Sequence, residues 1–261
     1  MRGAFTLVEL VLVLLVMALT AHLAVREVSR IRDAKLVTAA DRQLEEIREA
    51  ALAFLSDTGR SVVVTNGTLS ELWERPAGMP DYRVVPATAA NLVAGADPRL
   101  ANAGVSVPTG WRGPYLRLPF GKTRLLDPWG NPVETEDAAG FSRIGVTNVV
   151  YAASVSHYGP KGQADAVRTV PLVPERGGEC SLTVWATGPN LSGDVRLAWY
   201  GPASGMITGD VATVSANAQH RFEGLVPGER IVTAAKAGAS VPVVRLVDLK
   251  PGDNVLEVVI P

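Results

Sequence analysis

The hydrophobic and polar positions first follow the pattern of a membrane-spanning segment. Residues 5–25 are apolar at almost every position, and Glu9 is the one Asp, Glu, Lys or Arg among them. A run of about twenty apolar residues has the length that crosses a bilayer as an α-helix. The pattern therefore predicts a transmembrane helix, with the basic Arg2 on the cytoplasmic side.

The helical pattern continues beyond this segment, because residues 25–55 contain neither proline nor glycine. Apolar side chains recur there at spacings of three and four, which marks one face of a helix: Val37, Ala40, Leu44, Ile47, Ala51 and Phe54. Gly59 follows a short polar stretch and predicts the C-terminal cap. We expect one helix over residues 5–57, membrane-spanning to about residue 25, whose second part lies against a sheet. A free coiled-coil stalk is the alternative, which the lack of a sustained heptad disfavours.

The rest of the chain alternates short apolar runs with turns. Proline and glycine recur in residues 58–170, which predicts a first globular part of turns and short strands, with candidates at 61–64 and 82–85. Residues 171–178 read as a linker. Residues 179–261 hold strand-like runs without helical spacing, at 181–187, 195–200, 210–215, 230–235, 241–247 and 254–260.

These patterns predict an α+β chain. A long N-terminal helix packs on a small antiparallel sheet, and an all-β antiparallel sandwich of about seven strands follows. The near balance of 25 basic and 26 acidic residues gives no general attraction to nucleic acid. The single cysteine, Cys180, excludes an intramolecular disulfide and any site of several thiolates. No spacing of catalytic residue types indicates an enzyme.

Glu9 separates three interpretations of the N-terminus: a cleaved signal, a plain anchor and a prepilin signal. A carboxylate within an apolar span is costly, so it indicates a function and a partner. The run from Phe5 to Glu9, Phe-Thr-Leu-Val-Glu, resembles the processing motif of type IV pilins and pseudopilins. The resemblance implies a leader of residues 1–4, removed by prepilin peptidase between Ala4 and Phe5, and methylation of the new amine. Ala4 stands where the family usually has glycine.

The resemblance implies that the chain is a structural subunit of a type II secretion pseudopilus or of a related type IV pilus-like filament. Its partners would be prepilin peptidase, other pilin or pseudopilin subunits, the inner-membrane assembly platform and the membrane itself. The subunit would cross a bacterial inner membrane once, with its C-terminal domains outside the cytoplasm. Glu9 would neutralise the amine of a neighbouring Phe5, since a paired charge among apolar helices costs far less than a lone one.

Two motifs in the first globular part extend this resemblance to the major pseudopilin. The first runs from Gly110 to Leu116 and the second from Asp127 to Pro132. The residues expected to be structural are Gly113, Pro114, Tyr115, Asp127, Pro128, Trp129, Gly130, Asn131 and Pro132. For the second motif we expect an Asx-type turn, in which the Asp127 side chain accepts backbone N–H groups and Trp129 folds over the turn. Val133 replaces the aromatic residue usual in the family.

A later loop of that family binds calcium through hard oxygen ligands. The corresponding segment, residues 154–165, has Lys161 in place of the first aspartate and leaves Asp165 as its obvious carboxylate. Calcium takes six to eight oxygen ligands, commonly with two or more carboxylates. We therefore expect a loop that is held by its own hydrogen bonds, and no cofactor. In the alternative, in which calcium binds, Asp165 is the candidate ligand.

The last part resembles the regulatory-like β-sandwich found beside carboxypeptidases. The likeness rests on the run from Phe222 through Pro227 and Gly228 to Thr233, and on the turn at Pro251. Such modules bind or space other molecules. The alternatives are therefore a minor pilin for adhesion, or a secreted or membrane-anchored module for a carbohydrate or protein ligand. In the latter an ordinary signal would be cleaved near Ala21 or Ala24.

Overall fold

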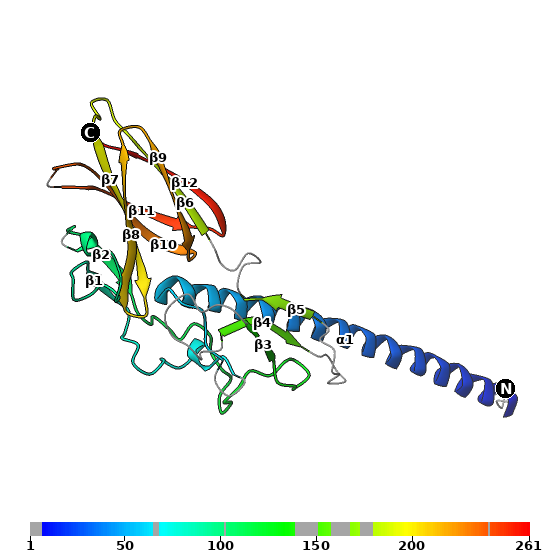
Figure 1. Ribbon diagram of the computed structural model, residues 1–261. Coiled ribbons are helices and arrows are strands. Elements are labelled where there is room, and N and C mark those ends of the chain that lie inside the picture. The colour runs from blue at the N-terminus through cyan, green and yellow to red at the C-terminus, as the bar shows by residue number, and fades with distance from the viewer. Residues whose placement is uncertain are drawn as a thin grey trace.

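A computed structural model describes residues 7–64, 68–101, 103–138, 151–157, 168–172, 180–239 and 241–261. The fold is α+β, as the sequence predicts: one long helix projects from a β-rich body (Figure 1). The helix α1 (Leu7–Thr58) has 52 residues, which corresponds to a rod of about 78 Å at ~1.5 Å per residue. Its predicted cap is confirmed, because Gly59 has a φ of +72° and its N–H donates to the Leu55 carbonyl at 2.8 Å.

The last third of α1 packs against the body through the predicted apolar face. Its buried apolar residues are Ala40, Leu44, Ile47, Ala50, Ala51, Phe54 and Leu55. The prediction for Val37 is wrong, because that side chain is 39% exposed. The packed face begins at Ala40, which is the first buried residue of the helix.

The helix lies against a small antiparallel sheet, as predicted. The sheet has the order β3-β4-β5, formed by β3 (Glu134–Ala138), β4 (Tyr151–His157) and β5 (Arg168–Pro171). Irregular segments complete the core, including the short helix η1 (Ser70–Leu72). The main residues of this core are Leu44, Ile47, Phe54, Val62, Leu69, Leu72, Met79, Val133, Val170 and Leu172.

The C-terminal part is a two-sheet sandwich. One sheet has the order β11-β10-β7-β8 and the other β12-β6-β9. The strands are β6 (Cys180–Thr187), β7 (Asp194–Ala203), β8 (Met206–Ser215), β9 (Gln219–Leu225), β10 (Gly228–Lys236), β11 (Val243–Leu249) and β12 (Gly252–Val259). The prediction of seven strands is thus confirmed. The purely antiparallel arrangement is wrong, because β12 pairs parallel with β6.

Two details of the sandwich differ from the sequence pattern. The strand β9 was not among the predicted runs, since its buried positions are limited to Phe222 and Leu225.

The charged residue Arg230 is buried in the sandwich, with only 2% of its surface exposed. Its guanidinium donates to the carbonyls of Glu229 at 2.6 Å and Pro227 at 3.0 Å, and burial lowers its pKa to about 10. These two carbonyls satisfy donors that burial removes from water.

A third core joins the first globular part to the sandwich. The strands β1 (Arg83–Pro86) and β2 (Ser106–Thr109) pair antiparallel, with the short helix η2 (Pro98–Leu100) in the segment between them. The predicted strand at 82–85 corresponds to β1, whereas 61–64 lies in an irregular segment. Val85, Leu100 and Val107 pack against Tyr200 and Ile207 of β7 and β8. Packing therefore crosses the predicted boundary at 171–178, of which residues 173–178 lie outside the described ranges.

Candidate functional site

The N-terminal part of α1 carries a continuous run of exposed apolar side chains. Every residue from 7 to 25 is exposed, with Leu7 at 80% and Val25 at 66%. The helix is long and apolar enough to cross a membrane, and its most apolar stretch is 0% buried, so it is not a core helix. A signal sequence near the N-terminus also contains an apolar helical stretch of this kind. Figure 1 shows this part extending beyond the body as a bare rod.

Glu9 lies in the first turn of the described helix and is exposed. The residues expected at the processing point, Ala4 and Phe5, lie outside the described ranges. The helix carries Glu9 at one end of the rod and the body at the other. An acid in this place is surrounded by apolar side chains of its own helix, so insertion into lipid or a helix bundle would remove it from water.

The opposite end of α1 forms a polar junction around Asp57, which is 8% exposed. Its Oδ2 accepts a hydrogen bond of 3.0 Å from the Tyr115 hydroxyl, and its Oδ1 lies 2.9 Å from Nη2 of Arg112. Burial raises the pKa of the Asp57 carboxyl; Arg112 and the Tyr115 hydrogen bond oppose this rise, while Glu229 of β10 adds to it. The junction therefore places the helix, the first motif and the sandwich around one carboxyl group.

The first motif folds over this junction. The Trp111 Nε1–H donates to the Glu71 carbonyl at 3.0 Å, and the Trp111 and Tyr115 rings meet edge to face at 6.1 Å. Gly113 leaves the space that the Trp111 ring fills, because a Cβ there would lie 2.6 Å from it. Pro114 is exposed. These residues pack and hydrogen-bond, and their arrangement is structural.

The second motif forms the predicted Asx turn. The Asp127 Oδ1 accepts N–H groups from Trp129 at 3.0 Å and Asn131 at 2.8 Å. Asp127 N–H donates to the Asn131 carbonyl at 2.7 Å, and Gly130 has a φ of +92°. Pro128 and Trp129 are half-buried, whereas Pro132 is exposed. Pro132 forms an isolated antiparallel β-bridge with Leu126. A buried carboxylate with this many donors from its own turn is a structural element.

The described residues do not form a metal centre. No group of three His, Cys, Asp or Glu side chains suited to a metal ion occurs within the described ranges. Asp165, the candidate calcium ligand, lies outside them. Cys180 is buried, and burial raises the pKa of its thiol to about 11, which disfavours the reactive thiolate.

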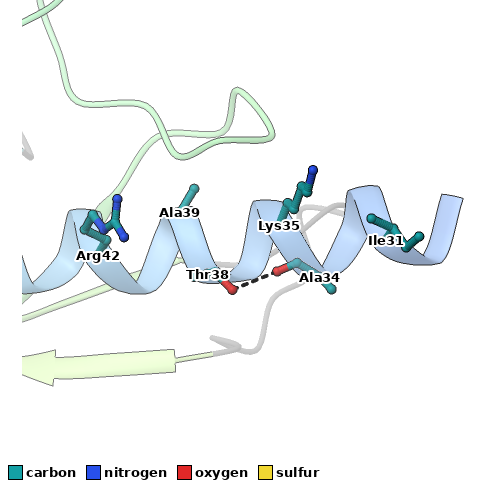
Figure 2. A pocket seen from close by; sticks show the side chains of 6 residues that line it. All are labelled: Ile31, Ala34, Lys35, Thr38, Ala39 and Arg42. Carbon is teal, nitrogen blue, oxygen red and sulfur yellow. Dashed lines mark hydrogen bonds between the residues drawn. The ribbon is translucent and has the colours of Figure 1, made fainter. Parts of the chain in front are cut away.

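An open depression of about 400 Å³ lies along the middle of α1. Figure 2 shows its lining on one stretch of helix: Ile31, Ala34, Lys35, Thr38, Ala39 and Arg42. The Thr38 hydroxyl donates to the Ala34 carbonyl at 3.0 Å, so this donor is satisfied by its own helix. The depression is exposed helix surface with basic side chains rather than an enclosed ligand site.

The sequence pattern did not indicate the role of Asp57, which lies in the short polar stretch before Gly59. The partners of Asp57 lie far along the chain, and Tyr115 is separated from it by 58 positions. A local signal existed only for Arg112 and Tyr115, which belong to the first motif.

No model of a known protein family matches the sequence, and no curated protein matches it.

Proposed function

We propose that the chain is a structural subunit of a helical filament of the pseudopilus or type IV pilus kind, built into it through α1. The observation that carries the proposal is the exposed apolar part of α1, with Glu9 as the one strongly ionised side chain among residues 7–25. A soluble protein rarely exposes an apolar surface of this size, and such a surface marks contact with a membrane or another protein.

The length of the apolar part fits a bilayer. Residues 7–25 span about 28 Å at ~1.5 Å per residue, close to the ~30 Å hydrocarbon core. The helix is then anchored in the membrane before assembly, and the body remains outside. In the filament the same surface packs against the helices of other subunits, because apolar side chains leave lipid for an apolar bundle at little cost.

Glu9 gives this assembly its specificity. Cleavage before Phe5 leaves a positive amine, and the Glu9 carboxylate of a neighbour neutralises it within the bundle. Such a pair fixes the axial position of one subunit relative to the next, since an uncompensated buried charge is strongly disfavoured. The Asp57 junction serves a different purpose: it holds the first motif of the body at the end of the rod. The Asx turn at Asp127 fixes a turn within the body.

The first test is the mass and N-terminal residue of the mature protein from its own membrane fraction. We expect a chain that begins at N-methylated Phe5. A chain that begins near His22 or Val25 would overturn the proposal and favour the secreted or anchored binding module.

The second test replaces Glu9 by leucine. Glu9→Leu should leave membrane insertion intact and abolish filaments, as seen by electron microscopy of sheared cell-surface material. Glu74→Leu is the matched control, since Glu74 is an exposed acid of the body, outside α1, and it should still assemble. Normal filaments from Glu9→Leu would exclude the proposed role of Glu9.

A further inference from the structure

Charged residues on α1 are divided between two neighbouring segments of opposite sign. The basic segment, residues 26–35, has a formal charge of +2 from Arg26, Arg30, Arg32 and Lys35 against Glu27 and Asp33. The acidic segment, residues 41–49, has a charge of −2 from Asp41, Glu45, Glu46 and Glu49 against Arg42 and Arg48. The basic segment follows directly after the apolar part of the rod, and the acidic segment begins after five intervening residues of the same helix.

Both segments present charges to the outside. All residues of the basic segment are exposed. In the acidic segment Leu44 and Ile47 are buried against the body, whereas Glu46 and Glu49 are exposed. The part of the acidic segment that faces solvent is therefore available to a second molecule while the body stays packed on the helix.

We propose that the basic segment of one copy pairs with the acidic segment of a second, parallel copy, so that the two helices are staggered along their axes. This inference rests on the proposed function, because it concerns the packing of the same helix. The second copy is a neighbour other than the one paired through Glu9, since that pair joins positions only four residues apart, about 6 Å along the helix. The centres of the segments are about 14.5 residues apart, so the stagger is about 22 Å at ~1.5 Å per residue.

Charge complementarity favours a second copy over a membrane surface. Anionic lipid headgroups would attract the basic segment alone and would repel the acidic one. A partner that supplies both signs at this spacing is the helix itself. A copy shifted by a fixed distance also makes an interface that does not close on itself, and interfaces of this kind generate open filaments.

The ion pairs between the two segments determine the axial alignment of neighbouring helices more than the strength of their binding. Exposed ion pairs are individually weak, and residues 7–25 provide the larger apolar contact. Complementary charges suppress wrong alignments, because like charges placed side by side repel. In copies aligned without a stagger, the two basic segments would lie together, as would the two acidic ones.

The test exchanges the signs of the two segments in the full-length chain. Arg32→Glu with Lys35→Glu changes the basic segment to −2, and Glu46→Lys with Glu49→Lys changes the acidic segment to +2. Each pair alone should lower the pelleted filament about tenfold, equivalent to about 1.4 kcal/mol, with normal N-terminal processing. The fourfold variant should recover most of the wild-type amount.

A matched control is Lys236→Glu with Arg245→Glu, two exposed residues of the sandwich, which changes the total charge as much as the first pair and should assemble normally. A fourfold variant no better than either pair overturns the inference and leaves the proposed function intact. If filaments are lost with Arg32→Glu and Lys35→Glu but form normally with Glu46→Lys and Glu49→Lys, the inference is also overturned, and the basic segment is assigned to lipid headgroups. A wild-type chain that forms no filament overturns both proposals.

Discussion

The docking of the sandwich on the end of α1 depends on a close backbone approach at Gly59. A Cβ on Gly59 would lie 1.8 Å from the Pro202 carbonyl oxygen of β7. The next contact along the chain is a hydrogen bond of 2.7 Å from Ser204 N–H to the Thr58 carbonyl. Gly59→Ala therefore cannot keep both the helix cap and this turn of the sandwich in place.

The expected cost has three parts. An alanine with left-handed φ costs about 1–2 kcal/mol, forced overpacking about 1–3 kcal/mol, and the lost hydrogen bond about 1 kcal/mol. Gly59→Ala should lower the free energy of unfolding by about 3–6 kcal/mol on this reasoning. Gly78→Ala is the matched control: Gly78 has a φ of +79° but nothing within 4 Å of its Cβ position, so it should lose only the conformational part, about 1–2 kcal/mol.

The assay is urea unfolding of the full-length chain in mild detergent, followed by tryptophan fluorescence. Hydrogen exchange of the Ser204 amide adds a local readout, because undocking exposes it in Gly59→Ala and not in Gly78→Ala. Equal destabilisation by the two variants, with unchanged exchange at Ser204, would show that the sandwich is not held against Gly59 and would refute the reasoning.

Three further predictions concern the polar groups. Tyr115→Phe keeps the ring but removes the hydroxyl that donates to Asp57, and should cost about 2 kcal/mol in urea unfolding; a loss below ~0.5 kcal/mol would argue against that bond. Burial raises the pKa of the Asp57 carboxyl above 3.8, so the folded state binds this proton more tightly than the unfolded state does. The stability of the wild type relative to Asp57→Asn should therefore be greatest below pH 3.8 and should fall as the pH rises through the folded-state pKa. A relative stability that rises with pH would contradict this assignment. Asp127→Ala leaves the N–H groups of Trp129 and Asn131 without their acceptor and should cost about 2 kcal/mol, with Asp81→Ala on an exposed side chain as the control.

The elements that the sequence predicted well depend on neighbours in the chain. The face of α1 follows from spacings of three and four, and the cap follows from Gly59, whose N–H reaches a carbonyl four positions back. The Asx turn likewise closes between Asp127 and Asn131. In each case residue type and local geometry suffice, because the interacting groups are brought together by the backbone of one turn.

Contacts between distant segments required the tertiary structure. The parallel pairing of β12 with β6 joins strands about seventy positions apart, as in the hydrogen bond from Ser181 to Asp253. Nor does the pattern of β1 and β2 indicate that they cover β7 and β8. An alternating strand can bury its apolar face against any sheet of suitable shape, so the choice of partner is made by packing of the whole chain.

The candidate site divides in the same way. Sequence alone determined the apolar run, its length and the position of Glu9 within it, because these are properties of consecutive residues. The tertiary structure decided that this run is exposed rather than buried in the body. It also decided that Asp57 meets Arg112 and Tyr115, since a buried carboxyl group is defined by side chains that folding brings from elsewhere in the chain.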